Sequence, residues 1–387
     1  MANAHLMLIC SLAGGLPSQT AVSEKGWVKP PKEVLRVLFK PEYKRDLGEF
    51  ELLKSNEEEW TAPLISRDGQ RLYVGTRVGR LQALDVATGN LIWQRLDMGT
   101  IGVGLAEFEN VLVVGSDSDI VGLDLANGKD RWKIGINGRI GGQIAVEGNL
   151  AIVPVRPNAF VAVDLSTGEQ KWRVQRQTPD SITVRGQATP TIDVARGQAY
   201  LGFSDGALVA VDLEDGGGKW VAQLGKQREF FADVDAAPIL VDGGKTLVAA
   251  SYNGGFARFD PSSGDVALKK SDAVRFVGLS PPEKGVIVAS HGDGQIMGIY
   301  ASSGKVRWRY RMKNGAPTAP ILLGDGHVLI GAAAGPLSVL RVSDGFPIQV
   351  INLSSGVSVP PAYRAPHMAA MTNTGLLLVF RQTAKSS

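Results

Sequence analysis

The residue types that most often do enzyme chemistry are few in this chain and lie far apart. The chain has four histidines and one cysteine, namely His5, His291, His327, His367 and Cys10. The histidine spacings do not match a metal-binding pattern such as H-E-x-x-H, and a single cysteine excludes an intrachain disulfide or a cysteine-based zinc site. We therefore predict no catalytic residue, no metal site and no cofactor.

Side chains suited to binding a protein partner are instead concentrated in two segments. The first contains the apolar, β-prone Ile182 and Val184 beside Arg185, and the second contains Asp233 and Asp235. An apolar stretch next to charge suits β-strand addition or a small mixed interface in which a few anchors provide most of the affinity. The two aspartates are expected as charges at the rim of that interface. In the alternative, Arg185 pairs with the aspartates, the apolar side chains are buried, and these residues only rigidify two loops.

These segments interrupt a regular sequence repeat. Seven 13-residue copies align without gaps, the ninth residue is glycine in every copy, and five copies end in tryptophan. The copies are LQALDVATGNLIW (81–93), IVGLDLANGKDRW (120–132), FVAVDLSTGEQKW (160–172), LVAVDLEDGGGKW (208–220), FARFDPSSGDVAL (256–268), IMGIYASSGKVRW (296–308) and LSVLRVSDGFPIQ (337–349). An alternating apolar stretch, a glycine turn that needs positive φ and a second short stretch indicate a β-hairpin.

A further pair of strands is expected before each hairpin, and its second strand is clearest at 71–75, 198–202 and 327–331. Four strands in a period of about 40 residues is the pattern of a β-propeller blade. Residues 375–380 begin an eighth blade, and the apolar segment 34–39 is expected to pair with it. The sequence thus predicts an all-β fold, an eight-bladed β-propeller with four antiparallel strands per blade, closed by an N-terminal strand on the last blade. The repeated tryptophans are interpreted as packing residues between neighbouring blades.

The lengths of the connections between blades lead back to the two segments with partner-binding side chains. In three blades the opening proline precedes the last residue of the repeat by 30 positions, from 63 to 93, 190 to 220 and 238 to 268. Because the blade body has constant length, extra residues must lie between blades, and the longest connections are 173–187 and 221–235. Consecutive connections emerge side by side on one face of a propeller. Loops longer than a rigid scaffold needs often carry function.

The net charge and the N-terminal segment bear on which classes of function remain for this chain. The 41 basic and 38 acidic residues leave a net charge of +3, without a basic run typical of nucleic-acid binding. Residues 1–33 are predicted to be a signal, a tether or a disordered linker, and residues 34–387 to form the propeller. The apolar stretch 6–9 before Cys10 leaves two alternatives: a degenerate lipoprotein signal with Cys10 as lipidation candidate, or a disordered extension or misplaced start codon.

The repeat itself resembles a known one. Its A-x-D-x-x-x-G-x-x-x-W pattern, seen in Ala83, Asp85, Gly89 and Trp93, resembles the repeat named after pyrroloquinoline quinone enzymes, which occurs in enzymes and non-enzymes alike. The resemblance to the dehydrogenases of that group implies adjacent cysteines beside the cofactor and a Ca²⁺ ion held by Glu, Asn and Asp. A chain with one cysteine cannot supply that pair, so a quinone-dependent enzyme stays the third interpretation.

Four segments resemble the BamB family of propeller lipoproteins, which belong to the machinery that assembles outer-membrane β-barrels. They are Ser181–Gly186, Phe203–Gly206, Asp233–Asp235 with Pro238, and Ala250–Gly254. The resemblance implies a non-enzymatic scaffold at the periplasmic face of the outer membrane that assists insertion of outer-membrane proteins.

The same resemblance implies a partner and its contact residues. The partner is the set of POTRA domains of a BamA-like protein, and unfolded outer-membrane proteins are a second candidate. The implied contact residues are Ile182, Val184, Arg185, Asp233 and Asp235. A propeller adaptor or sensor for another periplasmic partner is the alternative interpretation.

Overall fold

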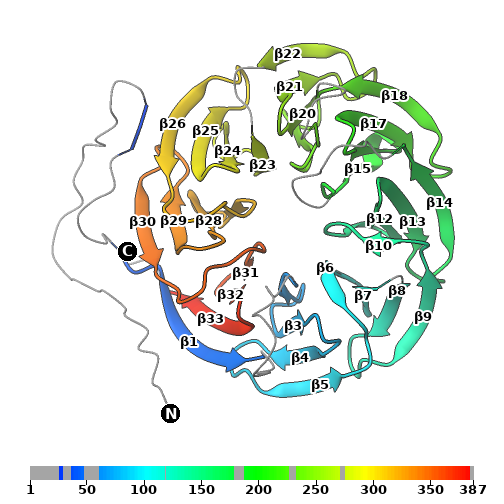
Figure 1. The fold of residues 1–387 in the computed structure, drawn as a ribbon, viewed down its shortest axis with the longest axis vertical. Helices are drawn as coiled ribbons and strands as arrows, with labels where there is room; N and C mark the ends of the chain where they lie inside the picture. The colour runs from blue at the N-terminus through cyan, green and yellow to red at the C-terminus, as the bar shows by residue number, and fades with distance from the viewer. Residues whose placement is uncertain are drawn as a thin grey trace.

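The computed structural model describes residues 26–28, 36–47, 61–117, 119–177, 187–225, 232–270 and 275–383. Within these ranges the chain forms 33 strands and one short 3-10 helix, η1 (Val194–Arg196). The strands make eight sheets, which Figure 1 shows arranged in a ring around a central axis. The eight-bladed β-propeller predicted from the repeats is confirmed. No helix within these ranges is long and apolar enough to cross a membrane.

The first four blades in chain order contain the strands up to β18. Their bounds are β2 (Leu64–Ile65), β3 (Arg71–Gly75), β4 (Leu81–Asp85) and β5 (Leu91–Arg95); β6 (Ile101–Phe108), β7 (Val111–Ser116), β8 (Asp119–Asp124) and β9 (Asp130–Gly135); β10 (Arg139–Ile140), β11 (Ala145–Glu147), β12 (Leu150–Arg156), β13 (Ala159–Asp164) and β14 (Gln170–Gln175); and β15 (Thr191–Asp193), β16 (Gln198–Gly202), β17 (Ala207–Asp212) and β18 (Gly218–Gln223).

The last four blades contain the remaining strands, with β1 added to the eighth. Their bounds are β19 (Ile239–Val241), β20 (Thr246–Ser251), β21 (Gly255–Phe259) and β22 (Val266–Lys270); β23 (Phe276–Leu279), β24 (Val286–His291), β25 (Gln295–Tyr300) and β26 (Val306–Arg311); β27 (Ile321–Leu322), β28 (His327–Ile330), β29 (Leu337–Arg341) and β30 (Pro347–Ile351); and β31 (Ala362–Arg364), β32 (His367–Met371), β33 (Leu376–Gln382) and β1 (Phe39–Asp46). Seven sheets have the predicted four strands, and one has five because β10 and β11 both pair with β12.

Burial along a strand depends on its place between hub and rim. All six residues of β7, a second strand, are buried, whereas the outermost strand β9 alternates between exposed and half-buried residues. A middle strand is covered by a neighbouring blade on both faces, so its sequence is continuously apolar rather than alternating. The ring therefore has an apolar core between every two neighbouring blades.

The repeated glycine and tryptophan form one device that joins five of the eight blades to the next. All seven ninth-position glycines have a φ between 64° and 78°. Each of the five tryptophans donates its indole N–H to a carbonyl of the following blade, at 2.9 or 3.0 Å. These bonds run from Trp93 to Leu125, Trp132 to Leu165, Trp172 to Leu213, Trp220 to Pro261 and Trp308 to Val342.

Close packing is a second reason why the ninth position requires glycine. A Cβ added at Gly128 would lie 2.6 Å from the Trp93 ring, and one at Gly345 would lie 2.3 Å from the Trp308 ring. The tryptophan of one blade thus packs directly on the glycine turn of the next. The predicted role of the tryptophans in packing between blades is confirmed.

Ring closure is confirmed, but the strand that closes it is not the predicted one. β1 (Phe39–Asp46) pairs antiparallel with β33, with Phe39 opposite Gln382 and Asp46 opposite Leu376. The sequence prediction placed this strand at residues 34–39, where the chain is most apolar. Residues 36–38 are not in a strand, and most of β1 is polar and exposed. An outermost strand needs few apolar residues, so an apolar run is a poor guide to its position.

Two side chains replace the repeated device where the chain ends meet. Tyr43 of β1 packs on Gly89 and donates its hydroxyl to Val86 O at 3.1 Å, as a tryptophan does elsewhere in the ring. Burial is the main cause that raises the pKa of Tyr43. Gln349 stands at the tryptophan position of the seventh repeat. Its Oε1 accepts from Leu38 N and Phe39 N, both at 2.8 Å, and its Nε2 donates to Phe39 O at 2.8 Å.

A short piece of the predicted N-terminal linker lies on the propeller. Val28 N donates to Arg309 O at 2.8 Å, and Arg309 N donates to Gly26 O at 2.7 Å, so this piece pairs parallel with β26. Val28 is 7% exposed and packs in the same apolar cluster as Trp308 and Tyr310. The segment 1–33 is therefore not a linker along its whole length, because residues 26–28 extend a blade.

Candidate partner-docking face

The two faces of the ring carry different loops. The connection face carries the chain between blades and the turn between the second and third strands of each blade. Backbone hydrogen bonds join these two kinds of loop: Leu224 N donates to Gly206 O, and Met312 N to Gly294 O, both at 2.9 Å. The opposite face, which we call the hairpin face, carries the repeated glycine turns. Both long connections therefore emerge on the connection face.

The turn Phe203–Gly206 between β16 and β17 receives the start of the first long connection. Arg176 Nε donates to Asp205 Oδ2 at 2.7 Å, which forms a half-buried ion pair. The Arg176 guanidinium also lies 5.7 Å from the centre of the Phe203 ring. A planar guanidinium can bind a carboxylate and stack on an aromatic ring at once, so Arg176 is a precise anchor for the chain that follows it.

Amide side chains hold both ends of the first long connection. Asn158 Oδ1 accepts from Ser204 N and Ser204 Oγ, both at 2.9 Å, and Asn158 Nδ2 donates to Gln177 O at 2.9 Å. At the far end, Gln187 Nε2 donates to Ala159 O at 3.0 Å, and Gln187 N donates to Gly141 O at 2.9 Å. The two ends of the first long connection, at Gln177 and Gln187, are thus fixed on the ring.

The second long connection is anchored on the same turn. Gln223 Nε2 donates to Asp205 O at 2.8 Å, and Gly225 N donates to Gly206 O at 3.0 Å. After residues 226–231, which lie outside the described ranges, Val234 N donates to Phe203 O at 3.2 Å. Both long connections therefore meet at Phe203–Gly206, and the predicted adjacency of these two loops is confirmed at their anchors.

The predicted contact residues fall into two groups. Ile182, Val184 and Arg185 lie outside the described residues, between the two anchors of the first connection. Asp233 and Asp235 follow the second gap and are described. Asp233 is only 2% exposed, and Asp235 is half-buried. The expectation that Asp233 is a rim charge is wrong, because the chain entering the next blade is already covered there.

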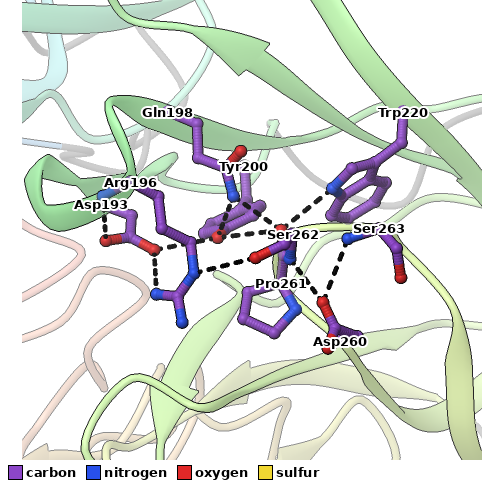
Figure 2. Close-up of polar contacts among 9 residues, drawn as sticks. All are labelled: Asp193, Arg196, Gln198, Tyr200, Trp220, Asp260, Pro261, Ser262 and Ser263. Carbon is purple, nitrogen blue, oxygen red and sulfur yellow. Dashed lines mark hydrogen bonds and ion pairs between the residues drawn. The ribbon is translucent and has the colours of Figure 1, made fainter.

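A hydrogen-bond network on the hairpin face joins the fourth blade (β15–β18) to the fifth (β19–β22) (Figure 2). Pro261 O accepts from Trp220 Nε1 at 3.0 Å, Gln198 Nε2 at 2.6 Å and Tyr200 OH at 3.3 Å. Asp193 Oδ2 accepts from Tyr200 OH at 3.0 Å. Burial is the main cause that raises the pKa of Tyr200. The fourth and fifth blades, on either side of the second long connection, are thus held together on both faces.

The remaining candidates for chemistry do not form an active site. Residues 202–206 match the G-x-S-x-G pattern of a serine nucleophile turn, which the sequence analysis did not identify. That pattern requires a strand followed by a helix, whereas here it links two strands and Ser204 Oγ donates to Asn158. The pattern is therefore a structural turn.

The three described histidines belong to different blades. His291 is 6% exposed, and burial lowers its pKa to about 4. His327 Nδ1 lies 2.9 Å from Asp325, and His367 Nδ1 lies 3.0 Å from Glu42. Within the described ranges no three His, Cys, Asp or Glu side chains gather as metal ligands would. Each histidine instead has a local role in packing or in a hydrogen bond to a carboxylate.

Comparison with known proteins assigns the chain to a family. Residues 77–310 match the family model described as "Outer membrane protein assembly factor BamB". A relative of that name from Burkholderia pseudomallei is 26% identical over 353 residues, which cover 87% of this chain and 90% of the relative.

Solved structures show the same fold. The crystal structure of BamB from Moraxella catarrhalis superposes with a TM-score of 0.72 at 22% identity and covers 89% of this chain and 99% of that one. Quinohemoprotein alcohol dehydrogenase from Comamonas testosteroni gives a TM-score of 0.70 at 15% identity, over 90% of this chain and 78% of that one. Because the propeller is shared by both, the family model, which spans more than half of the residues, decides between them. This chain belongs to the BamB family of outer-membrane protein assembly factors.

Proposed function

We propose that this protein is a non-enzymatic scaffold that docks on the POTRA domains of a BamA-like protein and assists insertion of outer-membrane proteins. The observation that carries the proposal is the meeting of both long connections at the turn Phe203–Gly206. The anchors of both loops are fixed on a rigid ring, and fixed anchors lower the entropic cost of binding a partner. Family membership makes the outer-membrane assembly machinery the natural partner.

A binding role agrees with the residues available for chemistry. The chain has one cysteine, so the adjacent cysteine pair implied for quinone dehydrogenases has no counterpart. The G-x-S-x-G turn has its serine bound to an asparagine rather than to a base. We propose that the protein works at the periplasmic face of the outer membrane, because its relatives are named as assembly factors of outer-membrane proteins.

Reversing the charge of Arg185 should weaken docking without unfolding the protein. Ile182 and Val184 are each expected to contribute about 1–3 kcal/mol when buried against the partner, and Arg185 adds a charge-assisted contact. Arg185→Glu should therefore reduce the affinity for purified POTRA domains at least about tenfold. The measurement is binding by titration calorimetry together with a thermal melt of the same variant.

Three further variants separate docking from loop stability. Lys129→Glu makes the same charge change on the hairpin face and should leave affinity unchanged. Asp235→Ala should weaken docking mildly. Asp233→Ala should instead lower the melting temperature, since its carboxylate is buried. If Arg185→Glu lowered the melting temperature and the affinity in parallel, the loop-rigidifying alternative would be correct.

Membrane anchoring through Cys10 is the second part of the proposal. Fifteen residues separate Cys10 from Gly26, the first residue described on the ring. A random coil of that length reaches roughly 21 Å, enough for the propeller to dock on a neighbouring protein. In the native host, after a high-salt wash that screens charge contacts, the wild type should stay with membranes and Cys10→Ser should not. Equal fractionation of the two proteins would remove Cys10 from the proposal.

A further inference from the structure

The outer strand of the sixth blade has an unusual charge pattern. β26 and its flanks read Lys-Val-Arg-Trp-Arg-Tyr-Arg-Met-Lys from residue 305 to 313, with a basic residue at every second position and no acid. We call Lys305, Arg307, Arg309, Arg311 and Lys313 the basic stripe. In a strand, residues two apart lie on the same side and about 6.6 Å apart, so the stripe is a row of like charges.

Burial shows that the stripe lies on the outside of the ring. Trp308 and Tyr310, which alternate with the arginines, are 0% and 8% exposed. Four members of the stripe are exposed, and Arg309 is half-buried. β26 lies at the outer rim of the ring (Figure 1). Its apolar side therefore fills the core between blades, and its basic side faces solvent.

The basic residues of another rim strand, β9, are closely matched by acids. On β9, Arg131 lies 2.7 Å from Asp124, and Lys133 lies 2.8 Å from Asp119. On β26 the Arg311 guanidinium is 3.9 Å from Asp293 and also lies 5.6 Å from the centre of the Trp27 ring. A row of five cations without interleaved acids creates a positive potential that favours an extended anionic surface.

The docked N-terminal piece identifies which anionic surface fits. Residues 26–28 pair with β26 through Arg309, directly along the stripe. The chain that precedes Gly26 contains the apolar residues 6–9 and Cys10, and it must start from this rim. If Cys10 carries a lipid, as proposed above, the membrane is held near the stripe rather than near any other blade.

We propose that the basic stripe of β26 is a membrane-facing surface that binds the phosphate groups of anionic phospholipids. The phosphates neutralise the row of cations, and residues 26–28 hold the tether beside it. The ring then stands with its sixth blade toward the bilayer. The charge argument does not depend on acylation of Cys10, so this surface should bind lipid in a protein without an anchor.

The test uses the full chain carrying Cys10→Ser, so that no acyl group contributes. Sedimentation with phosphatidylcholine vesicles is compared with and without phosphatidylglycerol. We expect binding only to the anionic vesicles. Each basic residue near such a surface changes the affinity roughly fivefold, so Arg307→Glu with Lys313→Glu should weaken binding more than about tenfold.

The controls identify the surface and the ligand. Lys129→Glu with Lys171→Glu makes the same charge change on exposed sites of other blades and should bind vesicles normally. POTRA affinity should be unchanged in the stripe variant, which separates this proposal from docking by the long connections. The proposal is overturned if the stripe variant still binds, if both double variants lose binding equally, or if inorganic phosphate at matched phosphate concentration displaces the vesicles.

Discussion

Deleting residues 1–46 should open the ring and produce a protein that aggregates. The deletion removes β1 and leaves β33 as an unpaired edge, in which residues 377–380 are buried in the intact protein. An exposed apolar edge strand is a template for pairing with other chains. The core also loses Leu38 and Phe39, which are 3% and 0% exposed and contribute about 1.5–3 kcal/mol apiece. Thermal melting and size-exclusion chromatography measure the two effects.

A shorter deletion provides the control for ring closure. Removing residues 1–25 leaves β1 and the docked residues 26–28 in place, so this protein should melt close to the full-length chain and stay monodisperse. The longer truncation removes the outer strand of the eighth blade and residues 26–28 on the sixth, whereas the shorter truncation removes neither. Equal melting temperatures for both would mean that the pairing of β1 with β33 does not hold the ring together.

Replacing Gln349 should be the most damaging single change at the joint between the chain ends. Gln349→Ala leaves Leu38 N, Phe39 N and Phe39 O without the partners that bind them at 2.8 Å. Each buried backbone group without a hydrogen bond costs about 1–3 kcal/mol. The free energy of unfolding, measured with denaturant, should fall by about 3 kcal/mol or more.

Two comparisons test whether the effect belongs to the joint. Gln170→Ala removes an exposed glutamine from the outer strand β14 and should change stability by less than about 0.5 kcal/mol. Gln349→Trp restores the residue of the repeat but cannot supply both an acceptor and a donor, so it should not recover the stability. A stable Gln349→Trp protein would show that the position requires packing rather than hydrogen bonds.

The joint and the candidate docking face depend on the same property of the ring. The glycine–tryptophan device fixes the relative position of neighbouring blades at five of the eight joints. The fourth and fifth blades, on either side of the second long connection, have an additional network centred on Pro261 O. Loops that leave such a base from fixed anchors can present a partner surface without a large loss of conformational freedom.

The sequence alone determined the architecture, because the repeat is local. The ninth-position glycines predict their own turns, since positive φ is a property of one residue. The tryptophan four residues later is specified by the same repeat. Because the blade body has constant length, the two long connections could be located from the sequence. The location of those loops on one face follows from chain direction alone, which explains why the anchors meet at Phe203–Gly206 as expected.

Tertiary structure alone decided the contacts between parts of the chain that are far apart in sequence. β1 was misplaced because an outermost strand is recognised by its partner β33 and not by its own apolar content. Tyr43 and Gln349 break the repeat, and only their positions at the joint show that they replace it. Asp233 looks like a surface charge until the neighbouring blade covers it. Residues 26–28 have linker composition, yet they pair with β26 because a blade edge offers free backbone groups to any extended segment that passes it.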